Sequence, residues 1–319
     1  MNTRVTRPSD ADRQGAPYDV LVVGGGAAGL SAALTLSRAR RSVVVLDSGS
    51  PRNAPADGVH GLLGLEGIAP SELLARGRAE VESYGGEIRP GTVTDVATTP
   101  AGFRATLGDG SEVEARRLLI ATGLVDELPD IPGVAEQWGS GVIHCPYCHG
   151  WEVRDQHIGV IATGPMSVHQ ALLFTQWSPT VTFFSGTAEI AEADRAQLDA
   201  AGVSVVGGAV TEVVSRAGGI ECVTTEDGVT HQVDAVVVAS RMVARLAPFA
   251  SLGVSATEHP VGEFVETDAT GRTGVPGVWA AGNASDLSAQ VGAAAAEGVR
   301  VGAQINADLI FTGLGTSHA

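Results

Sequence analysis

Residues 18–47, YDVLVVGGGAAGLSAALTLSRARRSVVVLD, decide the fold class of this chain. The apolar letters YDVLVV predict a strand at residues 18–23, and SVVVLD predicts a second strand that ends at Asp47. Between them, a glycine-rich turn leads into a stretch with the apolar spacing of a helix. The order strand, turn, helix, strand is typical of a βαβ unit, so we expect an α/β protein with a parallel sheet.

The glycines of this turn suggest what the unit binds. Gly24, Gly26 and Gly29 fit the pattern G-x-G-x-x-G. Glycines at these positions allow a sharp turn, a close approach of the backbone to a pyrophosphate, and close packing of the helix on the strand. Asp47 follows about 20 residues later, where a carboxylate accepts hydrogen bonds from an adenosine ribose. The pattern predicts a dinucleotide site, and a merely structural turn is the alternative.

The composition of the 319 residues excludes several classes of protein. With 20 basic and 36 acidic residues, the formal net charge is −16, which argues against binding to nucleic acid or to an anionic membrane. A hydrophobic share of 44% and a charged share of 18% are typical of a globular chain. Three cysteines are too few for a disulfide scaffold or a four-cysteine zinc site.

The N-terminal residues 1–17 mix charge with proline and glycine and lack an apolar segment. We therefore expect a disordered tail there rather than a signal peptide. No apolar run reaches the roughly 18 residues that a membrane span needs, so we expect a soluble, cytoplasmic protein.

The segments after the first unit predict how the chain is divided. A helix is expected over residues 70–84, followed by three strands in residues 86–120 that look like a small antiparallel layer. The last of these strands ends in a second glycine turn, Ala121 to Gly123, as a buried parallel strand does. The acidic, proline-rich residues 125–133 then read as a crossover into a second domain.

The second domain repeats the strand, turn, helix and strand pattern of the first, but with fewer of its glycines. Residues 157–186, HIGVIATGPMSVHQALLFTQWSPTVTFFSG, again predict strand, turn, helix and strand. Only Gly164 of the glycine pattern survives, and Pro165 has no backbone N–H to offer a phosphate. No acid ends the next strand, and Arg195 is the first arginine after it. We expect a Rossmann-like scaffold with an eroded NAD(P)H site, while functional NAD(P)H binding stays open.

The C-terminal residues return to the first domain. Residues 271–282, GRTGVPGVWAAG, predict a strand that is followed by a long alanine-rich helix. We therefore expect a dinucleotide-binding domain of residues 18–123 and 244–319, interrupted by an insert of residues 124–243. Gly282 and Asn283 stand at the end of the new strand, at the edge where open α/β sheets bind ligands.

The strongest chemical signal is HCPYCHG, residues 144–150. A lone C-x-x-C pair without a second pair favours a redox disulfide of Cys145 and Cys148 over zinc, and no metal site is expected. A proline between them suits a first helical turn, and a helix N-terminus stabilises a thiolate. His149 and His144 flank the pair, and either histidine can move protons near neutral pH or serve only in packing. Cys222 reads as a buried structural residue on a strand.

The whole layout beyond the tail resembles the low-molecular-weight thioredoxin reductases. The shared features are GGGAAG at residues 24–29, the turn at residues 121–123, C-x-x-C within an inserted domain, and T-x-x-P-G-x-W-A-A-G at residues 273–282. The resemblance implies a homodimer with FAD, in which Cys148 faces the flavin and Cys145 exchanges with substrate. It also implies a set of FAD-binding residues, which are Gly24, Gly26, Gly29, Asp47, Asn53, Ala121, Gly123, Gly282, Asn283 and Gln290.

The departures from those reductases resemble a branch of dithiol oxidases of the gliotoxin and holomycin type. His149 replaces the aspartate that acts as proton donor in the reductases, and the nicotinamide turn is altered. In that branch, electrons pass from a small-molecule dithiol through the C-x-x-C pair and FAD to molecular oxygen, giving hydrogen peroxide. Two rival functions stay open: an NADPH-fed disulfide reductase, and a redox-sensing flavoprotein without turnover.

Overall fold

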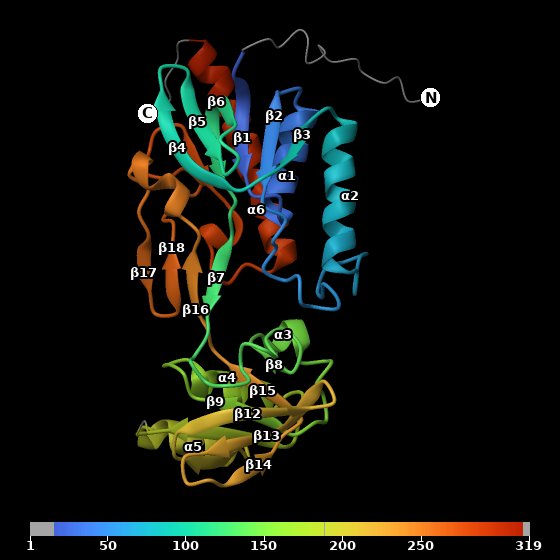
Figure 1. Cartoon of the computed structure of the whole chain (residues 1–319), viewed down its shortest axis with the longest axis vertical. Coiled ribbons are helices and arrows are strands. Elements are labelled where there is room, and N and C mark those ends of the chain that lie inside the picture. The colour runs from blue at the N-terminus through green and yellow to red at the C-terminus, as the bar shows by residue number, and fades with distance from the viewer. Residues whose placement is uncertain (1–15, 188, 315–319) are drawn as a thin grey trace. The chain divides into compact units, whose positions relative to one another are not determined.

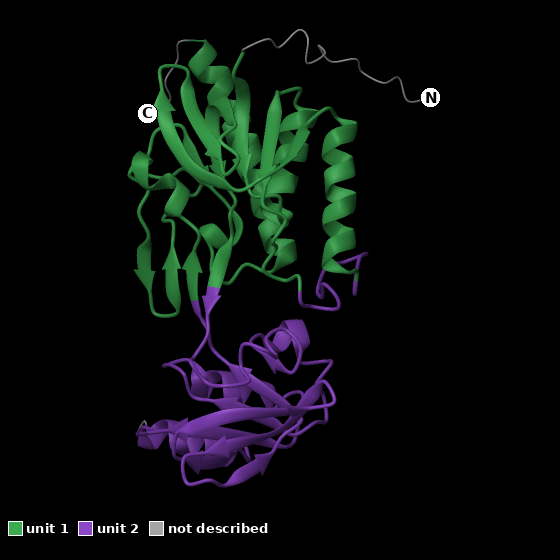
Figure 2. Ribbon diagram, viewed as in Figure 1, with its two compact units in different colours: residues 1–54, 68–125, 242–319 green, residues 55–67, 126–241 purple. Residues whose placement is uncertain are grey.

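The computed structural model describes residues 16–187 and 189–314, so most of the expected N-terminal tail lies outside the described residues. The chain forms two compact units, which Figure 2 colours separately. Unit 1 comprises the residues up to Ala54, Ile68–Val125 and the residues from Met242 onward. Unit 2 comprises Pro55–Gly67 and Asp126–Arg241.

The main sheet of unit 1 is built around the predicted βαβ unit. Its order is β3-β2-β1-β6-β5-β4, with β19 also paired to β6. The strands β3, β2, β1, β6 and β19 are parallel, whereas β4, β5 and β6 pair antiparallel. The predicted antiparallel layer therefore holds for β4 to β6, but β3 extends the parallel part instead. The bounds are β1 Tyr18–Val23, β2 Val43–Asp47, β3 Glu87–Pro90, β4 Val93–Thr99, β5 Gly102–Leu107, β6 Glu112–Ile120 and β19 Val278–Ala280.

The helices of unit 1 pack through small side chains. Helix α1, Ala27–Arg38, lies against the long C-terminal helix α6, Val291–Gly313, and α2 spans Pro70–Ser83 (Figure 1). A Cβ added at Gly298 of α6 would stand 2.1 Å from the carbonyl oxygen of Ala28 in α1. The absence of a side chain at Gly298 is therefore what lets the two helices approach so closely.

A second, smaller sheet of unit 1 carries the chain toward unit 2 and back. Its order is β17-β18-β16-β7. Two of the four points at which the chain passes between the units, at residues 125–126 and 241–242, lie in β7 and β16. The bounds are β7 Leu124–Glu127, β16 Arg241–Ala244, β17 Thr257–His259 and β18 Gly262–Phe264.

Unit 2 contains a parallel five-stranded sheet of order β11-β10-β9-β15-β8. The predicted strand, turn, helix and strand appear as β9, α4 and β10, so the α/β fold with two Rossmann-like units is confirmed. A three-stranded antiparallel sheet completes the unit, and Cys222 lies buried within its strand β13, as predicted. The bounds are β8 Val142–Ile143, α3 Pro146–His149, β9 Ile158–Ile161, α4 Ser167–Phe174, β10 Val181–Gly186, α5 Glu192–Ala200, β11 Ser204–Gly207, β12 Val210–Arg216, β13 Gly219–Thr225, β14 Thr230–Gln232 and β15 Ala235–Val238.

A search of the helices in residues 16–187 and 189–314 found none with the length and apolar character needed to cross a lipid bilayer.

Candidate active site

The glycine turn of unit 1 lies between the end of β1 and the start of α1. Gly24 has a φ of 109°, and a Cβ there would stand 2.2 Å from the carbonyl oxygen of Ala121. A Cβ on Gly29 would stand 2.0 Å from the oxygen of Gly24, so both glycines are required by the backbone itself. Gly26 differs, because a Cβ there would meet nothing within 4 Å. The open side of the turn therefore lies at Gly26, which begins α1 as its N-cap.

Asp47 holds this turn from the neighbouring strand. Its Oδ1 accepts a hydrogen bond from the backbone N–H of Gly25 at 3.1 Å, and its Oδ2 lies 3.9 Å from the guanidinium of Arg78. A Cβ on Gly25 would collide with the Asp47 carboxyl group at 2.7 Å. Gly25 is therefore a required glycine that the G-x-G-x-x-G pattern does not mark.

The C-terminal motif meets the turn in the same unit. A Cβ on Gly282, whose φ is 73°, would stand 2.8 Å from the Cβ of Ala28 in the first turn of α1. The N–H of Gly282 donates to Oε2 of Glu297 at 2.7 Å, and the N–H of Ala281 donates to the oxygen of Ile120 at 3.0 Å. These contacts bring the end of β19 beside the ends of β1 and β6.

Four further residues implied by the resemblance also belong to unit 1. The Asn283 side-chain amide donates to the carbonyl oxygens of Asp286 at 3.0 Å and Ala289 at 2.9 Å, so it shapes the loop before α6. Gln290 is the exposed N-cap residue of α6, and Asn53 lies half-buried in the turn after β2. Gly123, with a φ of 67°, follows β6.

This arrangement fits a dinucleotide such as FAD. The first turn of α1 contains no acidic side chain, so its unpaired N–H groups and its helix dipole favour the negative charge of a pyrophosphate. The space in front of Gly26 leaves the backbone accessible to that group. Gly26 would face the pyrophosphate in a turn that Gly24 and Gly29 shape, and Asp47 would accept hydrogen bonds from the adenosine ribose.

The C-x-x-C pair lies in unit 2 at the short helix α3. Cys145 is the N-cap residue and Pro146 occupies the first helical position, as predicted. The N–H groups of Cys148 and His149 donate to the carbonyl oxygen of Cys145 at 3.2 and 3.1 Å. This helical turn fixes the backbone of Cys148 relative to that of Cys145.

The side chain of Trp177 packs against this short helix. The Tyr147 ring packs edge-on against Trp177 at a centroid distance of 5.6 Å. A Cβ on Gly150 would stand 2.8 Å from the same indole and 2.4 Å from the carbonyl oxygen of Pro146. The glycine that ends HCPYCHG is therefore needed for α3 to lie on Trp177.

The two histidines beside the cysteines have different surroundings. Both the ring and the backbone of His144 have hydrogen-bond partners. The ring Nδ1 lies 3.3 Å from the carbonyl oxygen of Val238, and the carbonyl oxygen of His144 accepts a 2.6 Å hydrogen bond from the side-chain amide of Gln170. The Nδ1 of His149 is buried and has no hydrogen-bond partner within the part of the chain that the structure describes. A half-buried imidazole of this kind is available for proton transfer.

The charges around His149 adjust its proton affinity. Burial lowers the pKa of His149 below the ordinary value of 6.5, and positive charge on His60 and His144 lowers it further. The negative charges of Glu152 and Asp57 act in the opposite direction on that pKa. His149 is therefore a neutral base at neutral pH, and neither His60 nor Glu152 was predicted from the sequence.

The turn that would bind NAD(P)H in unit 2 is closed by its own side chain. The Ser167 hydroxyl oxygen accepts hydrogen bonds from the N–H groups of Thr163 at 3.0 Å and Gly164 at 3.2 Å. The Thr163 hydroxyl donates to the carbonyl oxygen of Ala239 at 2.9 Å. In a Rossmann turn that binds a dinucleotide, backbone N–H groups of this kind donate to a phosphate. Here the N–H groups of Thr163 and Gly164 donate to Ser167 instead. Arg195, the first arginine after β10, forms an ion pair with Asp199 at 3.1 Å.

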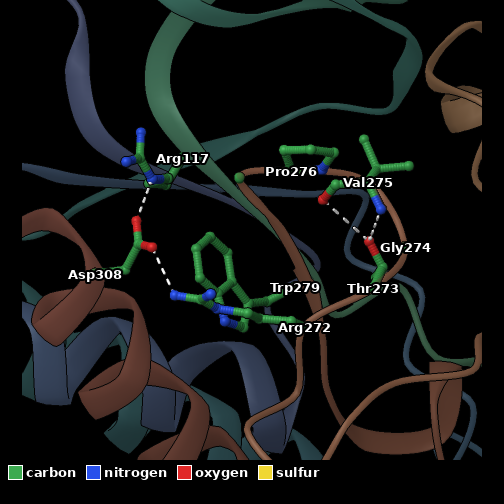
Figure 3. Close-up of a pocket in the computed structure, with 9 residues that line it drawn as sticks. Arg117, Arg272, Thr273, Gly274, Val275, Pro276, Trp279 and Asp308 are labelled. Carbon is green, nitrogen blue, oxygen red and sulfur yellow. Dashed lines mark hydrogen bonds and ion pairs between the residues drawn. The ribbon is translucent and has the colours of Figure 1, made fainter. Parts of the chain in front are cut away.

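A separate pocket of unit 1 lies near the start of β19, where the loop of residues 273–277 leads into that strand (Figure 3). Asp308 accepts a 2.6 Å hydrogen bond from Arg117 and another from Arg272, whose guanidinium lies over the Trp279 ring at 5.4 Å. Asp308 is thus shared by both guanidinium groups, and none of the predicted site residues lines the pocket.

Known proteins with similar sequences or structures point in one direction. The family model described as pyridine nucleotide-disulphide oxidoreductase matches residues 18–298. Thioredoxin reductase aclD of Aspergillus oryzae is 32% identical over 302 residues, which cover 88% of this chain and 95% of that protein. Thioredoxin reductase tcpT of Claviceps purpurea is 40% identical over 176 residues, but these cover only 52% of this chain and 55% of that protein.

The solved structures agree with the sequences. The crystal structure of HlmI superimposes with a TM-score of 0.89 and 42% sequence identity, over 94% of this chain and 95% of that one. The matches confirm the resemblance predicted from the glycine turn, the C-x-x-C pair and the C-terminal motif. The chain therefore belongs to the pyridine nucleotide-disulphide oxidoreductase family, as a thioredoxin reductase-like flavoprotein with FAD as its cofactor.

Proposed function

We propose that the protein is a cytoplasmic, homodimeric FAD-dependent dithiol oxidase that closes an intramolecular disulfide in a small-molecule dithiol. The substrate loses two electrons and two protons, and molecular oxygen takes up both to become hydrogen peroxide. The proposal extends the family assignment in two respects, namely the direction of electron flow and the acceptor.

The closed turn at Thr163–Ser167 is the observation that carries the proposal. A disulfide reductase needs a hydride donor, and its phosphates bind the free N–H groups of such a turn. Here the Ser167 hydroxyl occupies the N–H groups of Thr163 and Gly164, and Pro165 contributes none. An enzyme that draws electrons from its dithiol substrate does not need that site.

The cysteines and His149 provide the chemistry on the substrate side. A substrate thiol gives its proton to the neutral imidazole of His149, and the resulting thiolate attacks the Sγ of Cys145. The S–S bond between Cys145 and Cys148 breaks, and Cys148 leaves as a thiolate. The second substrate thiol then attacks the mixed disulfide, so the product departs with its own S–S bond and Cys145 is released reduced.

FAD, when bound, would supply the acceptor for the two electrons of the reduced cysteine pair, with oxygen as the final acceptor. The glycine turn and Asp47 of unit 1 would hold that group. Among known proteins, the similarity to HlmI over nearly the whole chain supports the resemblance to the gliotoxin and holomycin type of branch.

The stoichiometry of aerobic turnover tests the proposal. Purified enzyme is mixed with a small synthetic dithiol in the absence of any nicotinamide, and oxygen, hydrogen peroxide and free thiols are measured together. We expect one oxygen consumed and one peroxide formed for each pair of thiols lost. Absence of oxygen uptake with the dithiol, together with rapid NADPH oxidation when a disulfide is supplied, would instead identify a reductase.

A further inference from the structure

A segment inserted into unit 1 belongs structurally to unit 2. Residues Pro55–Gly67 connect β2 to α2 of unit 1 along the chain, yet they form part of the compact unit that carries the C-x-x-C pair (Figure 2). Val59 is buried, and its carbonyl oxygen accepts a 2.9 Å hydrogen bond from the N–H of Gly67. A Cβ on Gly139 would stand 2.8 Å from the Cβ of Pro55, which shows how closely the segment packs.

His60 of this segment lies between two carboxylates. Its Nδ1 is 2.7 Å from Oε1 of Glu66, whose Oε2 accepts a 2.8 Å hydrogen bond from the N–H of Gly61. The hydrogen bond from His60 and, to a smaller extent, the one from Gly61 lower the pKa of Glu66. This carboxylate is therefore anionic at neutral pH. The other ring nitrogen, Nε2, lies 3.6 Å from Oε1 of Glu152. Glu66 thus orients the ring, and the ring faces Glu152.

Glu152 connects this pair to the C-x-x-C helix. It stands three residues after His149, and its N–H donates to the His149 carbonyl oxygen at 3.2 Å. The titratable groups that act on His149 are Glu152, His60, His144 and Asp57. Among them, His60 and Glu152 are the two that pair with each other, at the 3.6 Å contact.

We propose that His60 and Glu152 are positioning residues of the C-x-x-C site, and that the ion pair between them sets how readily His149 accepts the proton of a substrate thiol. The proposal rests on the role given to His149 in the proposed function. In that step, the S–H bond breaks, the proton goes to the imidazole, and the electron pair stays on sulfur. Glu152 stabilises the imidazolium that forms, and His60 limits this effect because its ring contacts the same carboxylate at 3.6 Å.

The ion pair contributes little to folding, which makes substitution practical. The side chains of His60 and Glu152 are 26% and 43% exposed, and ion pairs this open contribute little to stability. We therefore expect His60→Gln and Glu152→Gln to fold and to retain FAD. His157→Gln is the matched control, because His157 is another partly buried histidine of unit 2 that bonds to Thr182 rather than to the site.

The test is a pH titration of the His149 ring by NMR in the reduced holoenzyme, with labelled histidine and with the signal assigned from His149→Gln. Glu152→Gln should lower the pKa of His149, His60→Gln should raise it, and His157→Gln should leave it unchanged. In the Glu152→Gln background, adding His60→Gln should have less effect, because only the direct repulsion between His60 and His149 then remains. Glu66→Gln, which frees the His60 ring, should shift the pKa in the same direction as His60→Gln.

The outcomes separate this inference from the proposed function. Shifts of the same sign in both single variants, equal effects of His60→Gln in both backgrounds, or no shift at all would overturn the inference. The NMR readout does not depend on oxygen or on the substrate. A missing dithiol oxidase activity together with the expected shifts would therefore refute the proposed function while keeping the electrostatic link.

Discussion

At the scale of single residues, the proposed chemistry depends on three side chains of one short helix turn. The N–H groups of Cys148 and His149 donate hydrogen bonds to the Cys145 carbonyl oxygen, and the half-buried His149 is the base next to the two cysteines. Because the two cysteines occupy different ends of the turn, their substitution is expected to have different consequences.

Cys145→Ser and Cys148→Ser should both abolish turnover but differ in absorbance. The resemblance to thioredoxin reductases implies that Cys148 is the cysteine next to the flavin, and a thiolate beside oxidised flavin gives a long-wavelength charge-transfer band. We expect this band in Cys145→Ser and not in Cys148→Ser, with FAD retained in both. The measurement is a visible spectrum of each purified variant. The reverse assignment of the band would exchange the roles of the two cysteines.

His149→Gln should reduce the rate of dithiol oxidation by roughly 10²–10⁴-fold, the usual contribution of a general base. Since burial lowers the pKa of His149, the imidazole is neutral above the ordinary value of 6.5 and becomes protonated only below it. The wild-type rate should therefore fall on the acid side of pH 6.5, and the variant should lack that limb. The measurement is oxygen uptake across pH. An unchanged profile in the variant would shift attention to His144.

At the scale of elements, the glycine turn between β1 and α1 separates structural glycines from one that faces a ligand. A Cβ on Gly24 meets the Ala121 oxygen at 2.2 Å, whereas a Cβ on Gly26 meets nothing within 4 Å. The φ of Gly26 is −80°, which any residue adopts, while that of Gly24 is 109°. The same substitution therefore tests two different roles.

Gly26→Ala should leave the folded protein intact but reduce its FAD content, because the added methyl group occupies the space in front of the phosphate-binding backbone. Gly24→Ala should instead lower the yield and the melting temperature of the protein, because it combines a backbone collision with a strained φ. FAD per chain and thermal unfolding are the two measurements. Full FAD occupancy with normal affinity in Gly26→Ala would contradict the assignment of this turn.

Sequence patterns predicted the positions of helices and strands better than they predicted which strands pair in the sheet. The order of β1, α1 and β2, the helix over residues 70–83 and the position of Pro146 in α3 follow from local periodicity and caps, and the structure contains them. Strand β3 was expected in the antiparallel layer, yet it pairs parallel with β2, because pairing depends on long-range contacts that local patterns do not encode.

The parts of the candidate site that escaped prediction all depend on contacts between distant residues. The Ser167 hydroxyl closes its turn through a side-chain contact, although the missing glycines already indicated an altered site. Gly25 is constrained by Asp47, which lies 22 residues away. His60 reaches Glu152 only because residues 55–67 belong to unit 2. A residue pattern read along the chain contains no signal for such pairs.

At the scale of the whole molecule, the two Rossmann-like units contain different parts of the candidate site. Unit 1 contains the residues that would hold FAD, and unit 2 contains the redox cysteines, His149 and a turn that its own serine closes. In the proposed function, electrons enter from a dithiol and not from a nicotinamide. This claim concerns the direction of electron flow through the complete protein, so it is tested on the intact enzyme.

Anaerobic stopped-flow mixing of the oxidised holoenzyme tests that claim most directly. One syringe holds the enzyme, and the other holds either a small dithiol or NADPH at equal concentration, while flavin absorbance is followed. The account predicts rapid bleaching by the dithiol and at least about 100-fold slower bleaching by NADPH, a difference of about 2.7 kcal/mol in activation free energy. Rapid, stoichiometric bleaching by micromolar NADPH, with none by the dithiol, would contradict it.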